Sequence, residues 1–317
     1  MALHTLAVPS PRDALPLQTA TTVAMDTFVA VHVAATAPSQ VFAEAAERAL
    51  GWFRIVERVA SRFDETSEVM RCARQPGGPV PVSPLLFQLV DFALALARRS
   101  GGAFDPTVGR ALELRGFNEH YVTGRRVDSP VPPGQVSYRD VELDRRRGTI
   151  TLRKPLVIDL GAIAKGLAID LAARELAPFG DFAVEAGGDL YVNGTHPAGR
   201  PWRVGIRHPV QPERLLCRLT VSGLAVCTSG NYERMAPDGS GHLLDPRRDS
   251  ARSDLASVTV LAPSAMAADG LATAAFVLCA NAGSRFLERE GAHGVFCTAS
   301  HARFTTRDFP FALEDAE

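Results

Sequence analysis

The hydrophobic residues of this chain follow a helical spacing in some regions and the spacing of short strands in others. After an alternating, strand-like "TFVAVHVAA", apolar residues recur every three or four positions from the expected cap Ser39 to about Phe63, and again from Pro84 to about Arg99. After Gly180, short apolar runs between turns at "AGGD", "VSGLA" and "TSGN" predict antiparallel strands. This order favours an α+β fold, with mixed or antiparallel sheets and packed helices, over a regular βαβ array.

Other segments extend this prediction. The stretch "VIDLGAIAKGLAID", residues 157–170, predicts a strand, a turn through a glycine and then a helix. The segments "ELDRRRGTITLRK" and "GVFCTASHARFTT" each predict a hairpin. Ser83 and Ser264 are expected to cap helices. The uncharged stretch 270–284 predicts a buried helix, because it is shorter than the roughly 20 residues of a membrane helix.

The composition indicates a globular chain with no electrostatic reason to bind nucleic acid or an acidic membrane. Its 317 residues are 46% hydrophobic and carry a formal net charge of -1, without a basic block. Residues 1–20 are rich in Pro, Thr and Ala without periodicity, so we expect them to form a disordered N-terminal extension. Residues 21–312 are expected to form a single domain.

The N-terminal sequence and the cysteines predict a cytoplasmic protein without a transmembrane segment. The chain does not start with basic residues followed by a continuous apolar run, and no cysteine that could carry a lipid precedes Cys72. The five cysteines are scattered and lack the spacing of a metal site, so we expect reduced thiols.

A lysine stands out in a chain that otherwise uses arginine. Of the 34 basic residues only Lys154 and Lys165 are lysines, and Lys165 lies in the first turns of a predicted helix, six residues after Asp159. Free N–H groups at a helix start, together with an ammonium group, suit a phosphate. The alternative is a solvent-facing lysine on an ordinary connection.

A second candidate pairs a carboxylate with a hydroxyl. In "ADGLATAAFVL", Asp269 and Thr273 are four residues apart, so both project from one face of an apolar helix. A buried carboxylate needs a partner, and Mg²⁺ would use both oxygens. The alternative is a carboxylate that accepts hydrogen bonds from nearby backbone N–H groups.

Two further segments carry side chains suited to chemistry. His242 and Asp245 lie near a turn, and histidine is well suited to acid/base work near neutrality, although most single histidines are not catalytic. In "GGAFDPTVG", Phe104 could pack on a ring and Asp105 could accept a hydrogen bond from one. This loop is equally consistent with a simple helix stop.

Together and in this order, these segments resemble the ApbE family of FAD:protein FMN transferases. The resemblance implies that FAD binds with Mg²⁺ at its pyrophosphate, that FMN passes through a phosphoester to a Thr or Ser of an acceptor flavoprotein, and that AMP is released. It also implies a fold of two intertwined subdomains. The matching segments lie between residues 102 and 278 and are "GAFDPTVG" (102–109), "VIDLGAIAKG" (157–166), "EAGGDLYVNG" (185–194), "TSGNYER" (228–234), "HLLDPR" (242–247) and "ADGLATAAFVL" (268–278).

The resemblance also implies roles for individual residues. The metal ligands would be the carbonyl of Ala162 and the side chains of Asp269 and Thr273. The catalytic residues would be His242, Asp245 and Lys165, with His242 deprotonating the acceptor hydroxyl. The residues in contact with FAD would be Met25, Phe63, Ala103, Phe104, Asp105, Asp159, Lys165 and Leu243.

Several positions depart from the family pattern, although none is a proposed metal ligand. Asp26 stands where the family usually has glycine, Phe63 where a tyrosine often packs on the flavin, and Arg115 where tryptophan is common. Arg248 and Asp249 replace a Thr-Gly pair. These departures, and the lack of the export signal that many relatives carry, leave two alternatives open: a Mg²⁺-dependent FAD pyrophosphatase that yields FMN and AMP, or a non-catalytic FAD-binding protein.

Overall fold

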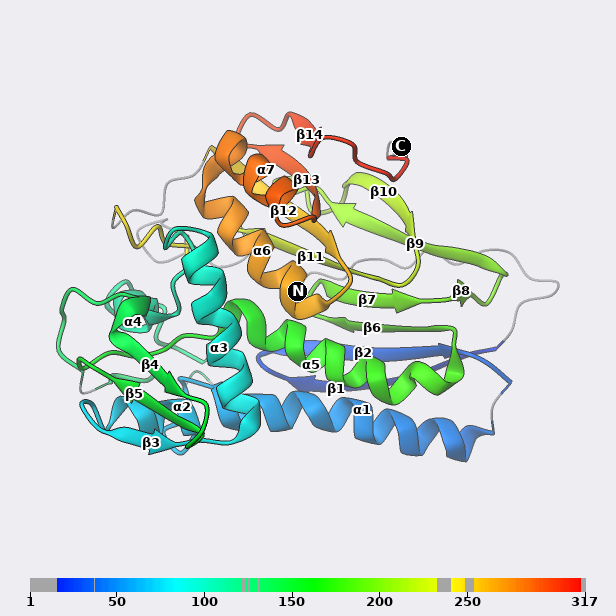
Figure 1. Ribbon diagram of the computed structural model, residues 1–317. Helices are drawn as coiled ribbons and strands as arrows, with labels where there is room; N and C mark the ends of the chain where they lie inside the picture. The colour runs from blue at the N-terminus through cyan, green and yellow to red at the C-terminus, as the bar shows by residue number, and fades with distance from the viewer. Residues whose placement is uncertain are drawn as a thin grey trace.

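A single antiparallel sheet of eight strands organises the protein (Figure 1). The computed structural model describes residues 16–36, 38–120, 124, 126–129, 131–232, 241–248 and 254–314. Each strand pairs antiparallel with its neighbours, although the spatial order departs from the sequence order. In spatial order the strands are β1 (Leu17–Ala24), β2 (Thr27–Ala34), β6 (Phe182–Ala186), β7 (Asp189–Asn193), β11 (Leu224–Gly230), β12 (Leu255–Ala262), β13 (His293–Thr298) and β14 (Arg303–Thr305).

Helices cover one face of this sheet (Figure 1). They bury Ala-, Leu- and Val-rich faces against the strands, and the two longest pack against each other. No helix in the described ranges has the length and hydrophobicity needed to cross a lipid bilayer. These helices are α1 (Ser39–Ala60), α5 (Gly161–Leu176), α6 (Ala265–Val277) and α7 (Cys279–Arg289).

A smaller sheet covers the opposite face, so the central strands have a core on each side. This sheet consists of β8 (Thr195–His196), β9 (Arg200–Arg207) and β10 (Leu215–Val221). Alternation along a strand divides neighbouring residues between the cores: Ala183 contacts the core around Trp202, whereas Val184 contacts the helical core. The shared sheet with two cores agrees with the expected α+β fold.

A third group of elements lies at one end of the molecule beside α3 (Pro84–Arg99) (Figure 1). Its strands are β3 (Pro79–Pro81), β5 (Thr149–Leu152) and β4 (Val141–Asp144), and its helices are α2 (Glu68–Ala73) and α4 (Gly109–Leu114). Short 3₁₀ turns occur at Pro106–Val108, Tyr138–Asp140 and Ala177–Phe179. The β4–β5 pair confirms the hairpin predicted from "ELDRRRGTITLRK".

Several helix boundaries follow the predicted caps, and one does not. The hydroxyls of Ser83 and Ser264 accept hydrogen bonds from the N–H groups of Leu86 and Ala267, which confirms both caps. Ser39 is instead the first helical residue of α1, because the chain enters the helix from Pro38 without a side-chain cap.

Four other details of the sequence prediction differ from the structure. Strand β1 begins at Leu17, inside the expected N-terminal extension. Residues 157–160 belong to no strand and form a connection whose backbone is hydrogen-bonded to Pro106 and Gly109, while "TSG" of the predicted "TSGN" turn belongs to β11. The stretch 270–284 contains the end of α6 and the start of α7, because the left-handed backbone of Cys279, with φ of 66°, interrupts the helix.

Helices α5 and α6 approach closely at Gly166. A Cβ atom on Gly166 would lie 2.4 Å from the carbonyl oxygen of Ala265 and 2.5 Å from Cα of Met266, both backbone atoms. Because backbone cannot shift as easily as a side chain, only glycine permits this spacing. The contact fixes which residue of α5 lies against the first residues of α6.

We predict that Gly166→Ala lowers the free energy of unfolding by about 2 kcal/mol or more, because the added methyl group overpacks this contact. The matched control is Gly51→Ala in α1, where a Cβ would meet nothing within 4 Å. There the substitution should stabilise the protein by about 0.5–1 kcal/mol through helix propensity. Chemical unfolding of both variants tests the pair, and equal effects would contradict it.

Candidate active site

The second turn of α5 brings Lys165 between two carboxylates. Its ammonium group forms an ion pair with Asp189, the first residue of β7, and lies 3.5 Å from Oδ2 of Asp269 in α6. The other Asp189 oxygen accepts a hydrogen bond from the backbone N–H of Thr228, at 3.0 Å. Lys165 is therefore held in place by a sheet and two helices and is not an ordinary solvent-facing lysine.

Burial and charge shift the protonation of this group. Burial alone would lower the pKa of Lys165, but the charges of Asp189 and Asp269 outweigh it, so the pKa is raised and the ammonium form is retained. Burial raises the pKa of Asp269, and the positive charge of Lys165 opposes that shift. The lysine is thus the compensating charge for the buried carboxylates.

The surroundings of Asp269 fit a hard cation. Asp269 is only 5% exposed, and its Oδ2 is buried without a hydrogen-bond partner among the described residues. Thr273 lies one turn further along α6, with its hydroxyl oxygen 3.1 Å from that of Ser229. Ala162 lies three residues before Lys165 on α5. Carboxylate, hydroxyl and carbonyl oxygens are ligands that Mg²⁺ accepts.

Carboxylates and histidines alone would not complete such a site. No group of three or more His, Cys, Asp or Glu side chains with metal-site geometry occurs in the described part of the chain. A divalent ion at Asp269 would therefore depend on neutral oxygens such as those of Thr273 and Ala162.

A buried arginine ties together the residues around Asp159. The Nε of Arg62 donates to Oδ2 of Asp159 at 2.5 Å, and Nη2 donates to the carbonyl oxygen of Phe117 at 2.6 Å. The other Asp159 oxygen accepts from the N–H of Gly161, the first residue of α5, at 2.8 Å. Asp159 thus anchors the start of the helix that carries Lys165.

An aromatic ring packs on this arginine, and further rings lie next to its contacts. The guanidinium carbon of Arg62 lies 4.1 Å from the centre of the Phe63 ring, and that ring meets His120 edge-on with 5.9 Å between centroids. The rings of Phe117 and His242 are 6.2 Å apart. The face of Phe63 that Arg62 covers is consequently not available for stacking on another ring.

The hairpin turn between β1 and β2 joins the same cluster. Nδ1 of His120 lies 2.8 Å from Oδ1 of Asp26. Met25 and Asp26 both have left-handed backbones, with φ of 52° and 60°. Met25 itself is partly buried against the helical core. The predicted flavin contacts Met25, Phe63 and Asp159 are thus linked through Asp26, His120 and Arg62.

The loop 103–109 is engaged in its own fold. Asp105 is buried and accepts hydrogen bonds from the backbone and hydroxyl of Thr107, at 2.9 and 2.7 Å, and from the N–H of Tyr138 at 3.0 Å. Burial raises the pKa of Asp105, and these hydrogen bonds oppose the shift. Ala103 and Phe104 are buried in the core. Such contacts are those of a structural loop.

The segment around His242 is held by two side chains. The side chain of Asn231 accepts a hydrogen bond from the N–H of Leu243 at 3.0 Å. Both oxygens of Asp245 accept from the guanidinium of Arg247, each at 2.8 Å. Burial alone would raise the pKa of Asp245, but the hydrogen bonds from Arg247 outweigh it and the pKa is lowered. Asp249 and residues 233–240 of this region lie outside the described residues.

The structure therefore presents two groups of candidate residues joined by α5. Lys165 and Asp269 form one group. Asp159, Phe63 and His242 belong to the other, in which Arg62 and Phe117 connect them. The sequence had not singled out Arg62, Asp189, Phe117, His120, Ser229 or Asn231. Asp189 lies in "EAGGDLYVNG", and Ser229 and Asn231 lie in "TSGNYER", two segments that match the family pattern. For Arg62 the signal was an arginine between Ser61 and Phe63 at the end of a long amphipathic pattern, which by itself does not distinguish a site from a surface.

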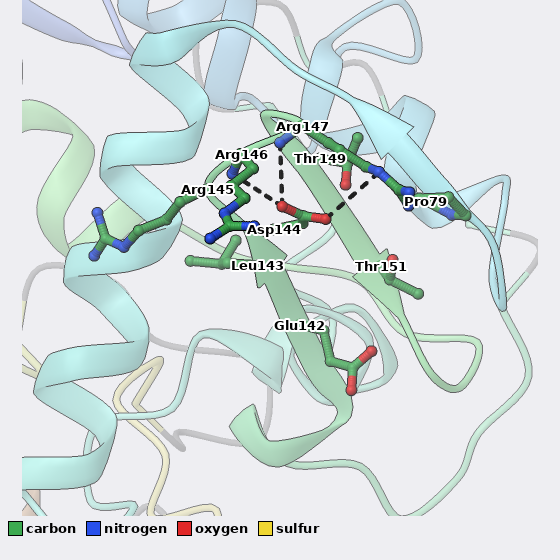
Figure 2. Close-up of a pocket in the computed structure, with 9 residues that line it drawn as sticks. All are labelled: Pro79, Glu142, Leu143, Asp144, Arg145, Arg146, Arg147, Thr149 and Thr151. Atoms are coloured by element: carbon green, nitrogen blue, oxygen red, sulfur yellow. Dashed lines mark hydrogen bonds and ion pairs between the residues drawn. The ribbon is translucent and has the colours of Figure 1, made fainter.

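The protein also has a hollow whose lining includes none of the candidate site residues. Its volume is about 730 Å³, and it lies on the β4–β5 hairpin, where Asp144 accepts hydrogen bonds from the backbone of Arg146 and Arg147 (Figure 2). The side chain of Arg145 points toward α3 (Figure 2). It donates hydrogen bonds there to both carboxylate oxygens of Asp91. None of the predicted site residues lines this hollow.

Comparison with known proteins identifies the family. The model of the ApbE family matches residues 25–296. The chain belongs to the ApbE family. It is 33% identical over 261 residues to the FAD:protein FMN transferase of Rhodobacter capsulatus, covering 79% of this chain and 49% of that protein. It is 32% identical over 247 residues to the FAD:protein FMN transferase of Salmonella typhimurium, covering 73% and 70%.

Solved ApbE structures share the fold. The ApbE protein of Thermotoga maritima superposes with a TM-score of 0.81 at 31% identity, over 93% of this chain and 98% of that one. The flavin transferase ApbE of Vibrio cholerae gives 0.79 at 25% identity, over 94% and 100%. The chain spans about half the length of the Rhodobacter relative and 65% of the Haemophilus influenzae one.

We predict that Arg247→Met lowers the free energy of unfolding by about 1 kcal/mol at pH 7, because Asp245 loses a partly exposed ion pair. The folded pKa of Asp245 lies below its usual 3.8, so the stabilisation is present above that value and disappears as the pH falls further. Urea unfolding at pH 7 and pH 3 measures both. In Arg248→Met the neighbouring, more exposed arginine is lost, and stability should hardly change.

Proposed function

We propose that this chain is a magnesium-dependent FAD:protein FMN transferase. It breaks the pyrophosphate of FAD, joins FMN through a phosphoester to a Ser or Thr of an acceptor flavoprotein and releases AMP. The observation that carries the proposal is the meeting of α5 and α6, where the ammonium group of Lys165 lies 3.5 Å from Oδ2 of Asp269 and this buried oxygen accepts no hydrogen bond from the described residues. The family match includes both helices.

The metal would be held by Asp269, Thr273 and the carbonyl of Ala162. Bound Mg²⁺ supplies charge that stabilises the phosphate oxygens and the AMP leaving group. Lys165 adds a permanent positive charge at the same pyrophosphate, and Asp189 keeps the ammonium in place through its ion pair. A compact ammonium suits such a crowded position better than a planar guanidinium.

His242 is proposed as the base. A ring nitrogen accepts the proton of the acceptor hydroxyl while the oxygen attacks the FMN phosphorus and the bond from that phosphorus to the AMP oxygen breaks. The Phe117 ring, against which His242 lies, limits the motion of the imidazole. Asp245, paired with Arg247, fixes the segment that carries His242.

The proposed FAD contacts are supported unequally. Asp159 has the strongest support, because Arg62 holds its carboxylate, and Met25 directly precedes Asp26, which pairs with His120. Ala103, Phe104, Asp105 and Leu243 are buried, so we propose that they line the FAD site without reaching into it. We also propose a reducing compartment such as the cytoplasm, because the five cysteines, all within the described residues, form no disulfide.

Product analysis tests this function. The purified protein is incubated with FAD, MgCl₂ and an acceptor flavoprotein, and the masses of the acceptor and of the small-molecule products are measured by mass spectrometry. An acceptor heavier by one FMN, with AMP released, is the expected result. Free FMN and AMP with an unmodified acceptor would establish a pyrophosphatase instead, and intact FAD would leave only binding. Both of these outcomes contradict the transferase.

We predict that Lys165→Ala and Asp269→Asn each lower turnover roughly hundredfold or more, because each removes charge stabilisation at the reacting phosphates. The matched control is Lys154→Ala, which removes the only other lysine, a half-exposed residue paired with Asp140. Its turnover should remain that of the unmodified protein. Full activity in either site variant would refute the assignment.

A further inference from the structure

Arg62 is a buried charge at the junction of three segments. It follows Ser61, the residue that caps the end of α1, and is only 6% exposed. Its guanidinium donates to Asp159 before α5 and to the backbone of Phe117 after α4, and it lies over the ring of Phe63. Each of these segments carries, or directly contacts, a residue proposed to bind FAD or to react.

The contacts continue beyond Arg62 on both sides. On one side the Phe63 ring meets His120, which pairs with Asp26 beside Met25. On the other side the Phe117 ring meets His242. A change in the position of Arg62 therefore reaches the β1–β2 turn, the start of α5 and the His242 segment together.

Such an arrangement is unfavourable as mere scaffolding. Removing a guanidinium from water is costly, and Nη1 of Arg62 is buried without a hydrogen-bond partner among the described residues. Apolar residues of similar volume often stabilise a core as well or better. What they cannot provide is a planar group that donates in two fixed directions while it stacks on a ring.

We propose that Arg62 is a positioning residue of the FAD site, which orients the Asp159 carboxylate and the Phe63 ring for the dinucleotide. The inference rests on the proposed function for the identity of the ligand, but it concerns binding and not transfer. Arg62 acts through Asp159 and needs no contact of its own with FAD.

The test compares Arg62→Lys and Arg62→Met with Arg145→Lys and Arg145→Met. Arg145 is a matched control, because it also forms two hydrogen bonds to one aspartate, Asp91, but it is exposed and lines the hollow on the β4–β5 hairpin, which none of the proposed site residues lines. Quenching of FAD fluorescence gives the dissociation constant for each variant. We expect it to rise about tenfold in Arg62→Lys, where one of two charged hydrogen bonds is lost, and further in Arg62→Met. The controls should bind as the unmodified protein does.

A double-mutant cycle separates positioning from general stability. If Arg62 acts through Asp159, then Arg62→Lys combined with Asp159→Asn should weaken FAD binding no more than the stronger single substitution. Independent, multiplying effects would overturn the proposal. So would unchanged FAD affinity in folded Arg62→Lys, even with a lower melting temperature. Arg62→Lys keeps the charge and decides the question if Arg62→Met does not fold.

The readout distinguishes this inference from the proposed function. Binding of FAD without transfer by the unmodified protein would contradict the transferase and leave the role of Arg62 to the affinity measurements. Transfer with normal affinity in Arg62→Lys would contradict only the role of Arg62.

Discussion

The close contact between α5 and α6 is the constraint on which the candidate site depends. Gly166 has no side chain, so the backbone of α5 can lie against that of Ala265 and Met266. The residue just before it, Lys165, then reaches Asp269, three residues further along α6. The ammonium and carboxylate are held by the main helices of the protein, which makes their spacing as rigid as the core itself.

The central sheet supplies the third member of this arrangement. Asp189 begins β7 directly after the tight Gly187–Gly188 turn, and its carboxylate is fixed by the backbone of Thr228 on the neighbouring strand. The sheet thus places the negative charge of Asp189 next to Lys165, on the side of the helices that faces the strands. The start of α5 is held in a similar way, because the Asp159 carboxylate accepts hydrogen bonds from the Arg62 guanidinium and from the N–H group of the first helical residue. One helix is consequently fixed at two points, each by an ion pair with another part of the chain.

The sequence predicted the features that depend on local patterns. The caps at Ser83 and Ser264 and the β4–β5 hairpin were confirmed because each depends on a few neighbouring residues. Strand β1 was not predicted, since its Thr-rich exposed face gives little hydrophobic signal. The pairing of Lys165 with Asp189 and of Arg62 with Asp159 could not be predicted either. These partners lie 24 and 97 residues apart, and only the packed fold brings them together.

The turn between β1 and β2 shows how this protein uses a strained backbone. Left-handed conformation costs a residue with a side chain roughly 1 kcal/mol, and Met25 and Asp26 both adopt it. A glycine at position 26 would relieve that strain but would remove the carboxylate that meets His120. The turn therefore keeps a strained backbone at Asp26 together with a contact to His120. This contact ties the outermost hairpin of the sheet to the segment that follows α4. The edge hairpin of the sheet is thereby held next to the segment whose His120 ring contacts Phe63, a proposed flavin contact.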